Sequence, residues 1–327
     1  ANHAITFDDT DTDMQPDFVW IKNRDANDAH CLFDAARGAT KLLSSDANTA
    51  EATDADTLDS FASDGFQVDA DDKVNTNTEK YVAWCWKAGT AHSNDQSATG
   101  VGDIDSEGSA NTTAGFSIAK FTTSGTSVQT VAHGLGAVPD MYIAKGRANN
   151  TSWFVYHKDM GNTHRISLDT GAAAVDNTMW GDTSPTSTVF SINPDNFGAT
   201  TSIGYFFKSI QGYSKIGLYT GNGNADGPFI YTGFQPSFIM LKTSSGTNGW
   251  WMGDSARSSY NNELSSLYPD DPEEEYTSSG HEVDWLSNGF KIRNTNGRFN
   301  TSGGTYIYIA FAKAPLVNSN GVPCTAR

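Results

Sequence analysis

The chain has 327 residues, of which 38 are acidic and 21 are basic, so its formal net charge is −17 at pH 7. A protein that binds a phosphate backbone needs clustered Lys and Arg, so this charge argues against nucleic acid as a main ligand. The uninterrupted apolar runs, such as residues 81–86, are far shorter than the roughly 20 residues of a membrane-spanning helix. We therefore expect no nucleic-acid partner and no membrane insertion.

The composition favours β structure. Gly, Ser, Thr, Asn and Asp are abundant, and aromatic residues reach 12%. Segments such as 18–21 and 306–309 are apolar and β-prone and lie between short polar turns, which is typical of strands. The sequence predicts an all-β protein.

A block of sequence occurs three times along the chain, which indicates three copies of one structural unit. Each copy opens with a strand that begins at a proline, and three further segments follow in the same order. The opening strands are PDFVWIKNR (16–24), PDMYIAKGR (139–147) and PSFIMLKTS (236–244). The second segments are HCLFDAARG (30–38), WFVYHKDMG (153–161) and WWMGDSARS (250–258). The third are SDGFQV (63–68), TVFSI (188–192) and SNGFKI (287–292), and the closing strands are YVAWCWK (81–87), SIGYFFK (202–208) and IYIAFAK (307–313).

Copies two and three share an additional first strand, GFSIAKFTTSG (115–125) and GYSKIGLYTGNG (212–223). A complete unit is then about 100 residues, the size of one β-sandwich of the jelly-roll, immunoglobulin-like or concanavalin-like kind. We predict three tandem β-sandwich units, at 1–90, 114–211 and 212–315. In the closing strand at 81–87, Val82, Trp84 and Trp86 share one face, and Tyr81, Ala83 and Cys85 share the other. Both faces are largely apolar, so we expect this strand to be central in its sheet and covered on both sides.

The first unit lacks the additional strand and retains only a remnant before its proline, residues 3–7. Three explanations are open. The chain is a piece of a longer protein, a neighbouring subunit supplies the strand by β-augmentation, or residues 115–121 complete the first unit. Between the first two units, residues 91–113 are rich in Gly, Ser, Thr and Asp and read as a flexible linker, and the polar segment 316–327 reads as a mobile tail.

The three cysteines, Cys31, Cys85 and Cys324, form no CxxC pair and no metal-ligand spacing. At two of these positions the other copies of the repeat have aromatic residues, which are usually core residues. We therefore expect buried, free thiols at both positions. A Cys31–Cys85 disulfide is the alternative. In the aligned repeats, Cys31 replaces Phe154 and Trp251, and Cys85 replaces Phe206 and Phe311.

A DxxR pattern occurs twice, at Asp34–Arg37 and Asp254–Arg257. The second unit has His157 and Met160 instead. An Asp and an Arg three residues apart can form an ion pair that braces a turn, and a ligand site is the alternative. A catalytic pair is rarely duplicated within one chain, so we favour the structural interpretation.

Clustered carboxylates can bind calcium, which takes six to eight oxygen ligands. None of the acidic clusters matches the twelve-residue calcium loop, so we expect solvated loops, with calcium as the alternative. The segment 221–227, GNGNADG, predicts a tight β-turn or a short loop, and it lacks the lysine and helix of a phosphate loop. The acidic clusters are Asp8–Asp13, Asp69 with Asp71 and Asp72, and Asp270–Glu275.

Single residues add little chemistry. We assign His133, in the sequence HGLG, to a turn and not to a metal site. Trp180, Trp250 and Trp251 could stack on sugars, but in a sandwich such residues are more often core. We expect no catalytic, cofactor-binding or metal-binding residue.

The long motifs GFSIAKFTTSG, VAHGLGAVPDMYIAKGR, WLSNGFKIR and GGTYIYIAFAKAP resemble the repeated β-sandwich region of tail-fibre-like virion proteins from marine bacteriophages. The resemblance implies a non-enzymatic virion component on a tail fibre or capsid appendage, exposed on the particle surface. Such a protein would form homo-oligomers, assemble with other virion proteins and contact a host-surface glycan or protein. The resemblance supplies no functional residues.

Two other functions are compatible with the same fold class. One is a secreted bacterial carbohydrate-binding or adhesion module. The other is a glycan depolymerase, which would need two carboxylates about 5–9.5 Å apart in a cleft. The three units share no acid/base pair, which argues against the enzyme.

Overall fold

The computed structural model describes residues 2–7, 13–258, 261 and 265–313. These residues form antiparallel β-sheets joined by turns and a few helices of three or four residues, so the chain is an all-β protein, as predicted. None of the helices in the described part is long and apolar enough to cross a membrane.

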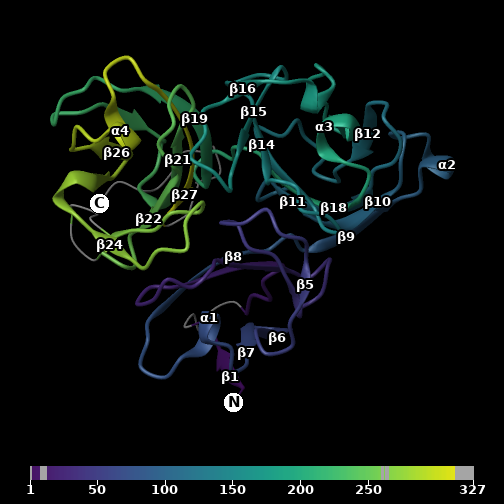
Figure 1. Cartoon of the computed structure of the whole chain (residues 1–327), viewed down its shortest axis with the longest axis horizontal. Helices are drawn as coiled ribbons and strands as arrows, with labels where there is room; N and C mark the ends of the chain where they lie inside the picture. The colour runs from purple at the N-terminus through teal and green to yellow at the C-terminus, as the bar shows by residue number, and fades with distance from the viewer. Residues whose placement is uncertain (1, 8–12, 259–260, 262–264, 314–327) are drawn as a thin grey trace.

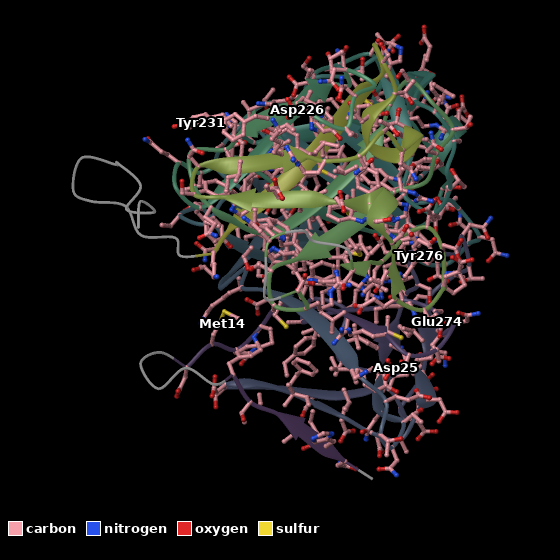
Figure 2. All side chains as sticks on the ribbon, turned by 90° about the vertical axis from the view of Figure 1, so that its left-hand side faces the viewer. Met14, Asp25, Asp226, Tyr231, Glu274 and Tyr276 are labelled. Atoms are coloured by element: carbon pink, nitrogen blue, oxygen red, sulfur yellow. The ribbon has the colours of Figure 1, made fainter. Side chains whose placement is uncertain are left out.

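The three repeats fold into three units grouped around a common axis (Figure 1). We call them unit 1 (residues 2–89), unit 2 (residues 90–211) and unit 3 (residues 212–313). Figure 2 shows one boundary, where Asp25 of unit 1 lies near Glu274 and Tyr276 of unit 3. The three units that we predicted in tandem therefore form a closed group.

Each unit contains two small packed sheets, an inner sheet toward the axis and an outer sheet. The inner sheets have the strand orders β3-β2-β8, β14-β13-β18-β11 and β22-β21-β27-β19. Their strands are β3 (Cys31–Asp34), β2 (Phe18–Asn23), β8 (Tyr81–Trp86), β14 (Phe154–His157), β13 (Met141–Gly146), β18 (Thr201–Phe207), β11 (Phe116–Thr122), β22 (Trp251–Asp254), β21 (Pro236–Thr243), β27 (Thr305–Ala312) and β19 (Ser214–Thr220). The outer sheets comprise β1 (His3–Ile5), β7 (Gly65–Val68) and β6 (Leu58–Ala62); β12 (Gln129–Ala132) and β17 (Val189–Ile192); and β20 (Phe229–Tyr231), β26 (Gly289–Ile292) and β25 (Val283–Leu286).

Short elements complete each unit at equivalent places. The hairpins that follow the second repeated segment are β4 (Lys41–Leu42) with β5 (Ala52–Thr53), β15 (His164–Ser167) with β16 (Val175–Asp176), and β23 (Ser265–Ser266) with β24 (Tyr276–Thr277). The helices before the closing strands are α1 (Asp72–Asn75), α3 (Pro194–Phe197) and α4 (Gly297–Asn300), and two 3₁₀ turns cover Thr178–Trp180 and Ser279–His281.

The inner-sheet strands are apolar on both faces because each face packs on a different core. On β2, Val19 and Ile21 face the core between the two sheets of unit 1, whereas Phe18 and Trp20 face an axial core shared by all three units. Met141 and Phe238 occupy the position of Phe18 in units 2 and 3 and reach the same axial core. Burial of each such side chain contributes about 1.5–3 kcal/mol, so the axial core stabilises the three units as one body.

The axis itself is filled. A cavity of about 20 Å³ remains there, lined only by apolar and aromatic side chains from the three units. This volume is close to the space of one water molecule, and the lining offers it no polar partners. The axis therefore acts as a core and not as a ligand site.

Residues 91–113 are not the flexible linker that we predicted. They contain β9 (Thr90–Asn94), α2 (Gln96–Thr99) and β10 (Ser106–Asn111), and β10 pairs with β11 along six residues. The segment is polar because it extends the sheet through main-chain hydrogen bonds at an edge, where few side chains need burial. Gly108 lies so close to the Ile118 carbonyl that a side chain would not fit there.

The prediction that the closing strand of the first unit is central was wrong for β8, although the closing strands β18 and β27 of the other units are central. β18 lies between β13 and β11, and β27 lies between β21 and β19, whereas β8 pairs with β2 alone among the described residues. The predicted remnant strand is present as β1. Because β11 pairs with β18 and β10, residues 115–121 do not complete unit 1. The predicted tail, residues 316–327, lies outside the described residues.

Candidate functional site

The units meet at three equivalent junctions, which we name 1–2, 2–3 and 3–1 after the units that they join. Each junction contains one equivalent main-chain hydrogen bond. Its donor is an N–H in the hairpin of one unit. Its acceptor is a carbonyl of the other unit, two residues after the lysine that all three repeats share. These hydrogen bonds run from Glu51 to Arg147 (2.8 Å), from Ala174 to Ser244 (2.9 Å) and from Glu275 to Arg24 (2.9 Å). The repeats therefore pack with approximate threefold symmetry.

A second ring of hydrogen bonds joins the units through side chains. Trp153 Nε1 donates to the Ser44 carbonyl (2.8 Å), and Trp250 Nε1 donates to the Ser167 carbonyl (2.8 Å). His30 replaces the tryptophan in unit 1. Its Nδ1 accepts from Trp20 Nε1 (2.9 Å), so its Nε2 carries the hydrogen and donates to the Tyr268 carbonyl (2.9 Å). Burial lowers the pKa of His30 to about 3, which keeps the ring neutral.

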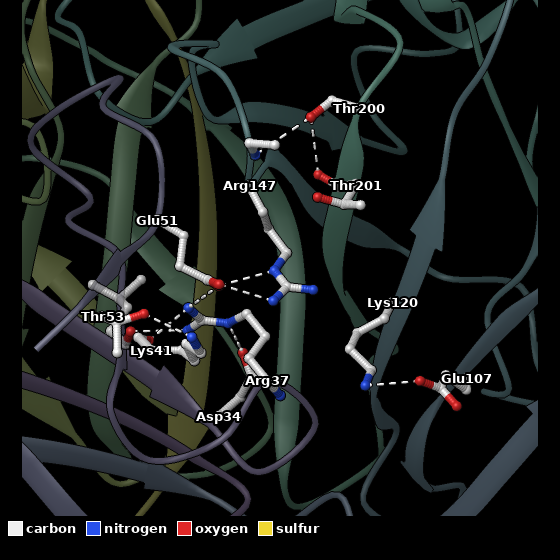
Figure 3. A network of polar contacts seen from close by, with 12 residues as sticks. Asp34, Arg37, Lys41, Glu51, Thr53, Glu107, Lys120, Arg147, Thr200 and Thr201 are labelled. Carbon is white, nitrogen blue, oxygen red and sulfur yellow. Dashed lines mark hydrogen bonds and ion pairs between the residues drawn. The ribbon is translucent and has the colours of Figure 1, made fainter. Parts of the chain in front are cut away.

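The first DxxR motif forms the predicted ion pair and lies at junction 1–2. Arg37 Nε is 2.5 Å from Asp34 Oδ2, and Tyr205 of unit 2 donates its hydroxyl to the same oxygen at 2.7 Å. Glu51 accepts from Arg37 Nη1 at 3.1 Å and from Arg147 of unit 2 in a bidentate pair (Figure 3). The motif therefore stabilises a turn and a junction between units.

The second DxxR motif repeats this arrangement at junction 3–1. Arg257 Nε is 2.6 Å from Asp254 Oδ2, and Glu275 binds both Arg257 and Arg24 of unit 1. Trp84 of unit 1 donates to Asp254 at 3.1 Å, in the place of Tyr205 at junction 1–2. In both motifs protein groups occupy the carboxylate oxygens, so the ligand-site interpretation has no support in this geometry.

Junction 2–3 has no such charge network among the described residues. His157 replaces the aspartate and is fully buried. Burial lowers its pKa to about 4. The neutral imidazole and the partly buried Met160 suit the apolar surroundings of this junction.

Three buried lysines were missed by the sequence analysis. Lys22, Lys145 and Lys242 lie near the ends of the proline strands with no exposed surface, and their amino groups donate to main-chain carbonyls. Two of these bonds cross junctions, from Lys145 to Asn48 (3.1 Å) and from Lys242 to Gly171 (3.2 Å). Burial lowers the pKa of Lys145 and Lys242 to about 8. The sequence does contain a signal for these buried lysines, because a lysine stands at the same position of the proline strand in all three copies.

Three aspartates at equivalent positions accompany the lysines. Asp46, Asp169 and Asp270 accept the main-chain N–H of His30, Trp153 and Trp250 at 2.9–3.1 Å. Burial raises the pKa of all three carboxyls, in Asp270 to about 6. The three aspartates thus hold the start of the second repeated segment within their own unit, whereas Lys145 and Lys242 also join neighbouring units.

The cysteines and aromatic residues follow the prediction in most respects. Cys31 and Cys85 are free thiols, which rules out the Cys31–Cys85 disulfide, and burial raises the pKa of Cys85 to about 12. A register shift in β21 makes Ala310, and not Phe311, the counterpart of Cys85. Cys324 lies outside the described residues. Trp180, Trp250 and Trp251 are core, with at most 1% exposed surface.

His133 lies in a turn, as predicted, and is buried. Leu135 N–H donates to its Nδ1 at 3.2 Å, its Nε2 lies 3.2 Å from the Thr186 carbonyl, and the ring stacks on Phe206. The segment 221–227 is a loop between β19 and β20, also as predicted. Asn300 holds this loop, because its side chain bonds to Asn222, Gly223 and Asn224.

The acidic clusters are only partly the solvated loops that we expected. Asp71 caps α1, Asp270 accepts the Trp250 N–H within unit 3, and Glu275 is held at junction 3–1. These three carboxylates are half-buried and engaged, which differs from the prediction, whereas Glu273 and Glu274 are exposed. Most of the cluster at 8–13 lies outside the described residues. Within the described part, no group of three His, Cys, Asp or Glu side chains is placed to hold a metal ion.

Several open grooves mark the surface, and two of them lie over unit 2 and along unit 3. The larger, about 780 Å³, lies over β9, β10 and β11 of unit 2. Its acidic side chains already have partners, since Asp95 caps α2, Asp103 binds Thr130, and Glu107 pairs with Lys120 at 2.8 Å (Figure 3). Its one aromatic residue, Phe121, is buried.

The smaller groove, about 430 Å³, lies along the free edges of β19 and β20 in unit 3. We call it the unit 3 groove. Phe229 and Tyr231 line it with 46% and 64% of their surface exposed, and Figure 2 shows Tyr231 at the periphery of the molecule. Lys215 contributes a cation, and Lys158 with Asp159 of unit 2 closes one side. Exposed aromatic rings beside polar groups make this groove the candidate binding site.

The fold and the groove define an all-β protein of three sandwich-like units around one axial core, with an aromatic surface groove. The chain belongs to the family described as "Domain of unknown function (DUF7483)", whose model matches residues 4–315. Comparison with curated proteins gives no significant match, and neither does comparison with solved structures.

Proposed function

We propose that the protein is a non-enzymatic virion structural component of a bacteriophage tail fibre or capsid appendage, and that the unit 3 groove contacts a host-surface glycan. The motif resemblance supports the virion role. The three units share one axial core and polar junctions, which suits a rigid structural part. In this role the protein assembles with other copies and other virion proteins on the particle surface.

The observation that carries the glycan contact is the exposure of Phe229 and Tyr231 in one groove. Flat aromatic rings stack on the apolar faces of sugar rings, because both surfaces are then removed from water. Lys158, Asp159 and Lys215 supply hydrogen-bond donors and acceptors for sugar hydroxyls beside these rings. Several copies on one particle would convert weak single contacts into avidity.

The test of binding is an array of bacterial surface polysaccharides probed with the full chain and two variants. Tyr231→Ala should weaken binding by about tenfold, the loss expected for one stacked ring. Tyr276→Ala is the matched control, since Tyr276 is 49% exposed on β24 and does not line the groove. Equal binding by all three proteins would overturn the glycan contact at this groove.

The virion role is tested separately by peptide mass spectrometry on density-purified virus particles and on the supernatant of the same culture. Enrichment of the chain with particles supports a virion component. Its presence only in the supernatant would instead favour a secreted carbohydrate-binding module. New reducing ends in the bound polysaccharide would identify a depolymerase and overturn the non-enzymatic assignment.

A further inference from the structure

In the described part of the chain, no strand covers one inner-sheet edge of unit 1, whereas the same edge is covered in the two other units. β11 covers the edge of β18, and β19 covers the edge of β27, each along seven residues. β8 occupies the same position in unit 1, but its described neighbour is β2 alone. The difference is visible in burial, because Ala83 is exposed whereas its counterparts Gly204 and Tyr308 are buried.

A groove of about 400 Å³ lies beside this edge, with an apolar wall formed by the sheets and a polar wall formed by residues 75–79. We call it the unit 1 groove. Apolar side chains from both sheets of the unit line it, and the loop between α1 and β8 borders it. The apolar lining residues are Ile5, Ile21, Phe66, Val68, Val74 and Tyr81.

The other two units show what fills the equivalent space. Phe121 of β11 packs edge-on against Phe190 at 5.5 Å between ring centroids, and Tyr219 of β19 packs edge-on against Phe290 at 6.3 Å. Phe66 is the counterpart of Phe190 and Phe290 in unit 1, and it lines the unit 1 groove.

Tyr81 is positioned for the same packing. Its counterpart Tyr306 stacks on Tyr219 with a centroid distance of 4.9 Å and an interplanar angle of 9°. The Tyr306 hydroxyl is held by the chain at α4, and the Tyr81 hydroxyl is held in the same way at α1, where it accepts from Thr76 N–H and donates to the Asp72 carbonyl. The ring is therefore fixed in place beside a space that a second aromatic ring fills in unit 3.

We propose that the β8 edge and the unit 1 groove bind an extended strand from a partner polypeptide, antiparallel to β8. The strand carries an isoleucine opposite Trp84, in the way that Ile118 lies opposite Tyr205 in unit 2. Three positions later it carries an aromatic residue opposite Tyr81. Its main chain pairs with β8, and its aromatic side chain enters the groove. This mode of recognition is β-augmentation, in which main-chain hydrogen bonds give affinity and side-chain pockets give register.

The first experiment adds a synthetic peptide to the full chain and follows amide hydrogen exchange. The peptide GFSIAKFTTSG has the sequence of residues 115–125 and supplies the required pattern. It should slow exchange across residues 81–86 by about tenfold or more and leave residues 305–312, which are already covered, unchanged. A peptide N-methylated at alternate residues, or one with Asp in place of the isoleucine, should bind at least about tenfold more weakly.

A second measurement does not depend on the affinity of a free peptide. Gln129 pairs with Ile192 as His3 pairs with Val68, so residues 115–126 placed directly ahead of Ala1 restore the loop length of unit 2. This graft should raise Tm by about 3–8 °C, and a scrambled graft should not. The proposal is overturned if neither peptide nor graft protects β8, or if β8 is already fully protected in the chain alone.

Discussion

Arg147 of unit 2 holds the Glu51 carboxylate of unit 1 in a bidentate ion pair, with both N–O distances at 2.8 Å (Figure 3). The same carboxylate accepts from Arg37, whose side chain is fully buried. One glutamate thus forms ion pairs with two guanidinium groups at a junction, and Glu275 does the same with Arg24 and Arg257 at junction 3–1. These two networks make the junctions sensitive to single substitutions.

Replacement of Glu51 by Gln should lower the free energy of unfolding by about 2–4 kcal/mol, because it leaves the buried Arg37 without one of its carboxylates. Chemical denaturation at pH 7 measures this loss. The matched control is Glu107→Gln, which removes an ion pair from a side chain with 64% exposed surface and should cost at most about 0.5 kcal/mol. Equal effects of the two substitutions would contradict a role for Glu51 in the junction.

The ion pairs of Glu51 should also make the protein less stable in acid. Burial raises the pKa of Glu51, but the hydrogen bond and charge of Arg147 and the charge of Arg37 outweigh it and leave the pKa below its ordinary value. A carboxyl with a lowered pKa in the folded state stabilises it above the unfolded pKa, and this contribution is lost as the pH falls through the folded value. The difference in stability between the wild type and Glu51→Gln should therefore shrink below about pH 4.

Lys145→Met should destabilise the protein at pH 7 by about 1–3 kcal/mol, because the carbonyls of Asn48 and Thr151 lose their donor. The pKa of Lys145 is lowered to about 8, so between pH 8 and 10.5 the unfolded chain binds more protons than the folded one. Wild-type stability should consequently rise across this window, and less so in the variant. Lys80→Met, at a side chain with 68% exposed surface, is the control. Identical pH profiles for wild type and Lys145→Met would refute the assignment.

Asp270→Asn tests a carboxyl whose pKa is raised in the folded state, so that its contribution to stability falls as the pH rises. Burial raises the pKa of Asp270 to about 6, partly opposed by Arg298, so the folded state binds more protons than the unfolded state between about pH 4 and 6. The contribution of this group to stability should be greatest below pH 4 and should decline as the pH rises to 6. Asparagine can still accept the Trp250 N–H and should remove this decline. Thermal unfolding from pH 4 to pH 7 distinguishes the two curves.

The thiols of Cys31 and Cys85 should resist modification in the native protein. Burial raises the pKa of both groups, and the thiolate is the reactive species. In a Cys324→Ser background, a thiol reagent at pH 8 should label neither residue until denaturant is added, and both should then react. Rapid labelling of Cys31 in the absence of denaturant would show that the core between the sheets of unit 1 opens.

Much of the fold could be predicted because the repeats display the same strands three times. The proline strands, closing strands and DxxR ion pairs follow from local pattern, and Trp180 follows from the usual burial of aromatic residues. The strand at 106–111 could not be predicted in this way, because β10 is held by main-chain pairing and its side chains carry no apolar alternation. The unit 3 groove was also missed, since Phe229 and Tyr231 are exposed only because β19 and β20 are edge strands.

The sequence by itself determined the all-β class, the threefold repetition and the two apolar faces of the inner strands, because these depend on residue type and spacing along the chain. Only the tertiary structure decided what the second apolar face packs against. Phe18, Met141 and Phe238 are far apart in sequence and meet at one axis, where they exclude water together. Lys145, Lys242 and the junction carboxylates acquire partners from a neighbouring unit, and a strand pattern carries no information about which surface of that neighbour it will meet.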